Sequence, residues 1–184
     1  MIITISGKPG AGKTSVGKML SERLNYKFYS IGSLRRELAL KKGLTIDQLN
    51  ELGEKEFWTD KYVDDYQIKI GMSENNCIID GRLSFHFIPS SIKIFIEVNL
   101  KIATERIFKN QRISEKSKNN LKGIREEIKK RIESDRKRYI KYYGVDCYDK
   151  KNYDIIIDTS NLKIKEVVDQ IQNKLNKHNL IKIN

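Results

Sequence analysis

The sequence predicts an α/β protein with a five-stranded parallel sheet and helices on both of its faces. Short apolar runs rich in β-branched residues alternate with longer segments in which apolar residues recur at helical spacing. The runs are continuously apolar, as expected for parallel strands that helices cover on both sides. The 184 residues contain no internal repeat and no low-complexity linker, so one domain is expected.

Five apolar runs are the predicted strands. In chain order they are 2–6 (IITIS), 28–30 (FYS), 77–80 (CIID), 92–98 (IKIFIEV) and 153–158 (YDIIID). Between them, Val16, Met19, Leu20 and Leu24 have helical spacing, and Thr45 precedes a polar first turn. Helices are therefore expected at 15–24, 34–41, from Thr45 onward, and at about 59–72, 100–109, 121–142 and 163–176.

Composition indicates the cellular location of the protein and the state of its cysteines. Apolar residues make up 39% and charged residues 33% of the chain, and no apolar run reaches the ~18 residues of a membrane span. The N-terminus lacks a basic segment followed by an apolar one, so a cytoplasmic location without a membrane partner is expected. Cys77 and Cys147 belong to no CxxC pattern, and reduced thiols are expected rather than a disulfide or a zinc site.

The formal net charge of +12 is concentrated in one part of the chain. Residues 101–150 hold 16 Lys and Arg against 8 Asp and Glu. Such a basic stretch is typical of nucleic-acid binding or of contact with small polyphosphates, and a solvated helix face is an equally simple explanation.

A phosphate-binding loop follows the first predicted strand. The segment GKPGAGKT matches GxxxxGK[ST] between a strand and a helix, the context that gives this motif its meaning. The backbone N–H groups of the glycine loop and of the helix start bind phosphate oxygens, Lys13 adds a charge, and the Thr14 hydroxyl can bind Mg²⁺. The ATP-binding residues expected are Gly7, Lys8, Pro9, Gly10, Ala11, Gly12, Lys13, Thr14 and Ser15.

The rest of the sequence narrows the class of P-loop protein. The guanine-binding tetrad NKxD of GTPases is absent from the sequence, and motor or AAA-type ATPases need a much longer chain. A kinase for a small metabolite or a nucleotide is therefore expected.

Several segments resemble the nucleoside monophosphate kinases, and in particular archaeal-type cytidylate kinases. YSIGSLRRELA at 29–39 is similar to their acceptor segment, and IIDGRL at 78–83 to the DGR of cytidylate kinases, where adenylate kinases usually have DGFPR. The R-x3-D-x2-R pattern at 131–138 resembles the lid of the bacterial enzymes. DKYVDDYQ, KRYIKYYGVD and YDIIIDTS resemble the short archaeal members. Lys8 departs from the small or apolar residue that the family usually has there, and 113–123 match nothing in it.

This resemblance implies a role for each motif. The single domain 1–184 would comprise a core (about 1–31, 74–105 and 143–184), a monophosphate-binding insert (about 32–73) and a lid (about 106–142). Catalytic roles would go to Lys13, Asp80, Arg131 and Arg138. The acceptor would be bound by Ser30, Gly32, Arg36, Asp80, Gly81 and Arg82, with Asp80 also reaching Mg²⁺ through water. Arg106, Arg112, Arg131, Asp135 and Arg138 would belong to the lid, with Asp135 orienting Arg131 and Arg138.

The function expected is Mg²⁺-dependent transfer of the γ-phosphoryl group from ATP to CMP or dCMP by a monomer. Phosphoryl transfer depends mainly on positioning and charge neutralisation, and no general base is assigned. An adenylate kinase-like enzyme or another small nucleotide kinase is the first alternative. A P-loop ATPase that binds nucleic acid through its basic half is the second.

Overall fold

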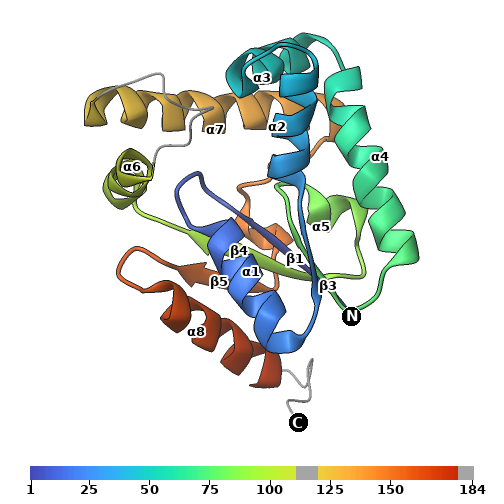
Figure 1. Ribbon diagram of the computed structural model, residues 1–184, viewed down its shortest axis with the longest axis vertical. Helices are drawn as coiled ribbons and strands as arrows, with labels where there is room; N and C mark the ends of the chain where they lie inside the picture. Colours follow the sequence, from blue (N-terminus) through green and yellow to red (C-terminus); the bar gives the residue numbers. More distant parts are fainter. Residues whose placement is uncertain (111–119, 178–184) are drawn as a thin grey trace.

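The computed structural model describes residues 1–110 and 120–177, and these form one α/β unit (Figure 1). Its five strands are β1 (Ile2–Gly7), β2 (Lys27–Ser30), β3 (Cys77–Asp80), β4 (Ile92–Glu97) and β5 (Ile155–Asp158). They form one sheet in the order β2-β3-β1-β4-β5, and every neighbouring pair is parallel. The predicted fold class is confirmed.

The helices follow the predicted segments closely. They are α1 (Lys13–Leu24), α2 (Ile31–Lys41), α3 (Ile46–Lys55), α4 (Trp58–Ser73), α5 (Ser84–Phe87), α6 (Leu100–Lys109), α7 (Leu121–Tyr143) and α8 (Ile164–Lys177), with a short 3₁₀ turn η2 (Lys150–Asn152). Helix α2 starts at Ile31 rather than at the expected Leu34, so its first turn directly follows β2. Helix α5 was not predicted, because four residues are too few to display a helical period.

Helices and aromatic residues bury the two faces of the sheet. On one face, Ile3 and Ile5 of β1 join a core with Val167 and Ile171 of α8, and α1 lies beside α8 (Figure 1). A second cluster, on the other side, consists of Leu83, Phe85, Phe95, Tyr139, Cys147, Tyr148 and Tyr153. Both cysteines are free and buried, as expected.

The parallel arrangement brings the carboxyl ends of β1, β2 and β3 to one edge of the sheet. Asp80, at the end of β3, pairs in register with Ile5 on one side and Ser30 on the other. Helices α2–α4 form an insert between β2 and β3, and α6 and α7 lie between β4 and β5. Helix α7 crosses to the insert and contacts α3, so the two helical regions meet beyond this edge (Figure 1). Ligands of α/β proteins bind at such edges.

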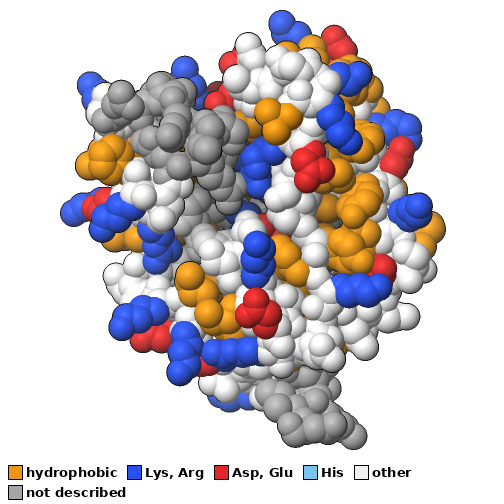
Figure 2. All heavy atoms as spheres, viewed as in Figure 1, with side chains coloured by type: hydrophobic (Ala, Val, Ile, Leu, Met, Phe, Trp, Pro, Cys, Tyr) orange, Lys and Arg blue, Asp and Glu red, His pale blue; other side chains and the backbone are white. Residues whose placement is uncertain are grey.

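Charged side chains are dispersed over the surface that Figure 2 shows. Lys and Arg lie over the core and over both helical regions, with Asp and Glu among them, rather than in one continuous patch. Within residues 1–110 and 120–177, no helix has both the length and the apolar character that a membrane span requires.

Candidate active site

A cavity of about 820 Å³ lies at the carboxyl edge of the sheet. Its volume falls in the upper part of the ~300–1,000 Å³ range of small-molecule sites. The phosphate loop from Pro9 to Ser15 lines one side, and α2, α4 and the segment 80–83 line the other. Its basic lining residues are Lys13, Arg35, Arg36, Arg82, Arg106, Arg131 and Lys163, against the acidic Asp60, Asp64 and Asp80. The cavity therefore favours an anionic ligand.

The phosphate loop turns sharply from β1 into α1. At Gly7, φ is +148° and a β-carbon would lie 2.1 Å from the carbonyl oxygen of Ile96, so only glycine lets the loop pass this close to β4. Gly12 precedes α1 and has no side chain to cap it. The first-turn N–H groups of α1 are thus directed toward a ligand, where the helix dipole favours an anion.

The side chain of Lys13 folds back onto the phosphate loop. Its Nζ donates to the carbonyl oxygens of Gly7 at 2.9 Å and Lys8 at 3.1 Å. Burial, together with the nearby charges of Arg82 and Arg131, lowers the pKa of Lys13 to about 8 against the opposing effect of Asp80. These cations come from three separate segments and line the same cavity, where a phosphate group would neutralise them.

The side chain of Lys8 does not follow the expectation of an ATP contact. Its Nζ pairs with Glu97 Oε1 at 2.8 Å, on the β4 side of the loop. Lys8 therefore contributes its backbone to the loop, and the carboxylate at the end of β4 explains the direction of its side chain.

Thr14 and Asp80 form an oxygen pair beside the loop. Thr14 Oγ1 donates to Asp80 Oδ2 at 2.6 Å, and Ser30 Oγ lies 3.5 Å from the same oxygen. Hydroxyl and carboxylate oxygens are the ligands that Mg²⁺ prefers, and this ion keeps several waters in such sites. The donor set at this position fits Mg²⁺.

Gly81 and Arg82 follow Asp80 at the end of β3. Arg82 lines the cavity, while its Nε pairs with Asp135 Oδ2 of α7 at 2.5 Å and donates to Tyr148 Oη at 3.2 Å. Asp135 was expected to orient Arg131 and Arg138. Asp135 pairs with Arg138, as expected, and also with Arg82 of the segment that follows β3, a contact that no local sequence pattern indicates.

Three of the expected acceptor residues lie at the start of α2. Ser30, Gly32 and Arg36 all line the cavity, and Arg36 Nη2 also donates to Ser33 Oγ at 3.1 Å. The neighbouring Arg35 lines the cavity too and was not predicted. Its Nη1 pairs with Asp60 Oδ1 at 3.0 Å.

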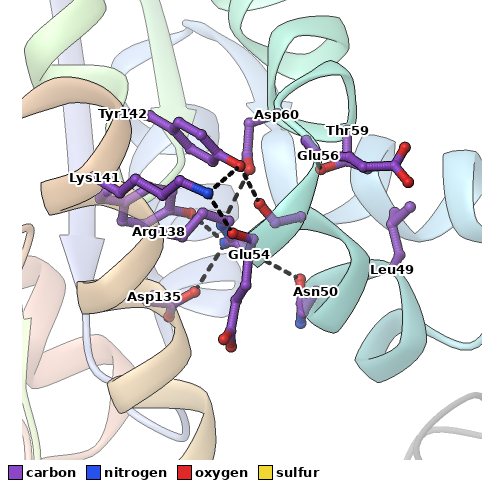
Figure 3. A network of polar contacts seen from close by, with 12 residues as sticks. Leu49, Asn50, Glu54, Glu56, Thr59, Asp60, Asp135, Arg138, Lys141 and Tyr142 are labelled. Carbon is purple, nitrogen blue, oxygen red and sulfur yellow. Dashed lines mark hydrogen bonds and ion pairs between the residues drawn. The ribbon is translucent and has the colours of Figure 1, made fainter.

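Arg131, Asp135 and Arg138 lie along α7, but they do not converge as expected. Arg131 lines the cavity. Arg138 is only 1% exposed, and its guanidinium pairs with Asp60 at 3.1 Å and Asp135 at 3.1 Å (Figure 3). Arg138 is therefore not at the cavity surface where the transferring phosphoryl group was expected to meet it. It joins the insert to α7, because Asp60 of α4 offers a buried carboxylate there.

The charges around Asp135 decide its ionisation. Burial alone would raise the pKa of its carboxyl, but Arg82, Arg138 and Arg131 outweigh that effect and hold the pKa below its ordinary value. Asp135 is therefore the anion that holds Arg82 and Arg138 in position.

Arg106 of α6 closes another part of the cavity. Its guanidinium donates to Thr159 Oγ1 at 3.1 Å and to the Thr159 carbonyl oxygen at 2.6 Å, so it is fixed to the segment after β5. Arg112 and most of the unassigned segment 113–123 lie outside the described residues.

Two polar residues of α4, Asp64 and Gln67, line the cavity and were not predicted as site residues. Together with Asp60 they occupy positions i, i+4 and i+7 of the helix, a spacing that puts them on one face. A polar stripe at this spacing was the sequence signal available for them.

The fold and the phosphate loop put the chain in the class of P-loop proteins. A shikimate kinase from Bacteroides thetaiotaomicron superposes on it with a TM-score of 0.66, covering 96% of this chain and 98% of that one at 18% sequence identity. At this identity the likeness is one of fold alone.

The chain belongs to the cytidylate kinase-like family, whose model matches residues 2–161. The cytidylate kinase of Sulfurisphaera tokodaii is 36% identical over 178 residues, which are 96% of each chain. An S-adenosylmethionine-dependent nucleotide dehydratase of Lacinutrix mariniflava is 35% identical over 181 residues, which are 97% of this chain but 37% of that larger protein. The protein is thus a nucleotide kinase, as the resemblance of its motifs implied.

Proposed function

We propose that the protein transfers the γ-phosphoryl group of ATP to CMP or dCMP, giving ADP and CDP or dCDP, with Mg²⁺. The observation that carries this proposal is the two-sided cavity. A phosphate loop lines one side, and a second set of phosphate-compatible groups lines the other. Lys13, Arg82 and Arg131 all line this cavity, and the charges of the two arginines act on Lys13. The relatives named cytidylate kinase support the choice of acceptor.

ATP is assigned to the loop side of the cavity. Backbone N–H groups of the loop and of the α1 start would hold the polyphosphate. Lys13 would exchange its bonds to the carbonyls of Gly7 and Lys8 for phosphate oxygens. Thr14 would hold Mg²⁺ directly and Asp80 through water, and the ion would neutralise charge on the transferring group.

The monophosphate is assigned to the insert side. Ser30 and Gly32 lie at the start of α2, whose N–H groups and dipole favour an anion. Arg36 and Arg82 line the same part of the cavity, and a guanidinium can bind two phosphate oxygens at once. Asp80 and Gly81 connect this side to the loop.

Transfer itself would depend on charge and alignment. Lys13 and Arg131 would stabilise the charge on the transferring group, while Arg138 acts through Asp135 to hold Arg82. Arg106 and the region 106–142 are assigned the role of lid, which would exclude water as a competing acceptor.

A coupled assay of ADP release across all ribo- and deoxyribonucleoside monophosphates tests the proposal. We expect the highest kcat/KM with CMP or dCMP and loss of turnover when Mg²⁺ is chelated. A preference for AMP would favour the adenylate kinase-like alternative. ATP turnover that needs nucleic acid and no monophosphate would favour the nucleic-acid-binding ATPase.

A further inference from the structure

Asp64 and Gln67 lie on the acceptor side of the cavity, and the handling of phosphate gives them no role. Both belong to α4 and line the cavity, yet they are only 6% and 2% exposed. They follow Asp60 on the same helix face, but Asp60 is occupied by Arg35 and Arg138.

Asp64 is a buried carboxylate whose partners are neutral. The Tyr143 hydroxyl donates to Oδ2, and Gln67 Nε2 donates to Oδ1 over a long 3.3 Å. Among residues 1–110 and 120–177, the ion pairs do not include Asp64. Burying a carboxylate without a cation is costly, and burial raises the pKa of Asp64 to about 7. Such a residue in a cavity is a candidate for ligand binding.

Contacts behind Gln67 fix the direction of its amide. Ser84 Oγ donates to Gln67 Oε1 at 2.6 Å, so Nε2 is the end that faces Asp64. At Gly81 a β-carbon would lie 2.2 Å from Ser84 Oγ and 3.1 Å from Gln67 Oε1. The glycine of the DGR segment is therefore needed for this arrangement.

The pair offers an acceptor beside a donor. Asp64 Oδ1 accepts, and the adjacent Gln67 Nε2 has a further N–H to donate. The pairing edge of cytosine has the complementary order, with the N4 amino donor beside the N3 acceptor. Uracil has the opposite order, because its O4 accepts and its N3–H donates.

We propose that Asp64 and Gln67 read the base of the acceptor nucleotide. The Asp64 carboxylate accepts a hydrogen bond from the N4 amino group of cytosine, and the Gln67 amide donates to N3. Uracil is rejected because its O4 would face the carboxylate. This inference rests on the proposed function and names the residues that decide its specificity.

The substitution Asp64→Asn tests the assignment, with Asp65→Asn as its matched control. Asp65 is the next residue of α4, but its side chain is 59% exposed and pairs with Lys61. We expect the ratio of kcat/KM for CMP over UMP to fall at least ~10-fold in Asp64→Asn, since hydrogen bonds to charged groups carry this much discrimination. Asp65→Asn should leave the ratio unchanged. A purely structural role for Asp64 would lower both activities and leave the ratio as it was.

A substrate lacking the amino group completes the test. In the 2-pyrimidinone ribonucleoside monophosphate, hydrogen replaces N4 of cytosine. The wild-type enzyme should use it at least ~10-fold less well than CMP, and Asp64→Asn should discriminate less than ~3-fold. Equal discrimination by the two enzymes would overturn the inference. If the variant fails to fold, equal use of CMP and the analogue by the wild-type enzyme would overturn it.

These outcomes separate the inference from the proposed function. A wild-type preference for a purine monophosphate overturns both. A wild-type preference for CMP, with an Asp64→Asn ratio equal to that of the wild type, overturns the base-reading role alone.

Discussion

The two sides of the cavity are built by different means. On the loop side, Lys13 bonds to carbonyls five and six positions before it, and most of the phosphate-binding groups lie within one short segment. On the insert side, Asn50 and Arg138 are 88 positions apart, and the four helices α2, α3, α4 and α7 contribute to one buried network (Figure 3). One side is local in sequence, and the other exists only after folding.

Because of this difference, we expect substitutions on the two sides to affect different properties of the protein. On the loop side, the charges are directed toward the ligand and contribute little to the stability of the folded state. On the insert side the charges neutralise one another out of water, so that removing one leaves its partners buried and unpaired. Variants of the loop should lose activity and keep their stability, whereas variants of the buried network should lose stability first.

The largest expected effect is that of Lys13→Ala. We expect kcat/KM to fall by at least ~10³-fold, because the variant loses the charge at the transferring phosphoryl group. The melting temperature should stay close to that of the wild type, since Lys13 forms no ion pair with the described part of the chain in the absence of nucleotide. Steady-state kinetics and thermal unfolding of the same samples check this. Lys18→Ala, an exposed lysine of α1, is the control, and near wild-type activity in Lys13→Ala would contradict the role of the loop.

Arg138→Met should destabilise the buried ion-pair network on the insert side. It leaves the carboxylates of Asp60 and Asp135 without this cation, and we expect the free energy of unfolding to fall by about 3–5 kcal/mol. Denaturant unfolding measures the change. The control is Arg136→Met, whose half-exposed pair with Asp146 should be worth less than ~1 kcal/mol. Equal effects of the two variants would show that the buried network does not hold the insert to α7.

Asp64→Asn should stabilise the fold in a pH-dependent way. Because the pKa of Asp64 is about 7 in the folded state and about 4 in the unfolded state, the folded state binds this proton more tightly. Wild-type stability from this group therefore increases as the pH falls from 7 to 4, and ionisation above pH 7 is destabilising. The variant should exceed the wild type by ~2 kcal/mol at pH 8, and this advantage should shrink toward pH 5.

Thermal unfolding at pH 5 and pH 8 measures that difference. The groups whose charges or hydrogen bonds act on Asp64 are Tyr143 and Arg138 of α7, Arg35 of α2, and Asp60 and Gln67 of α4. The Asp65→Asn variant keeps Asp64 and all of these groups, so its stability should differ from that of the wild type by an amount that does not depend comparably on pH. A pH-independent difference between Asp64→Asn and the wild type would mean that folding does not raise the pKa of Asp64.

The smallest effect is expected at the start of α3 in the insert. Thr45 Oγ1 accepts from the N–H of Gln48 at 3.1 Å, and Gln48 Oε1 accepts from the N–H of Thr45 at 2.8 Å. Thr45→Ala removes half of this capping box and should cost about 1 kcal/mol, or a fall of ~2–4 °C in melting temperature. Thr45→Ser keeps the hydroxyl and should restore most of it. A loss of activity without a loss of stability would argue against a merely local role.

Much of the site was predictable because its signals are local. The loop from Gly7 to Thr14 and the segment from Asp80 to Arg82 each lie at the end of an apolar strand, and parallel strands end at one edge. The partners of Arg138 were not predictable. Its spacing from Asp135 predicted the correct helix face, but Asp60 reaches that face only through the packing of α4 against α7.

The sheet, the phosphate loop and the family follow from local sequence signals, because strand periods, glycine turns and short motifs depend on neighbours along the chain. The packing of distant segments was needed to show that Arg138 is a buried link, that Lys8 is directed to Glu97, and that Asp64 and Gln67 face the cavity. These outcomes depend on burial and on charges brought together from distant segments. Burial sets the cost of an unpaired charge, and no residue carries that information alone.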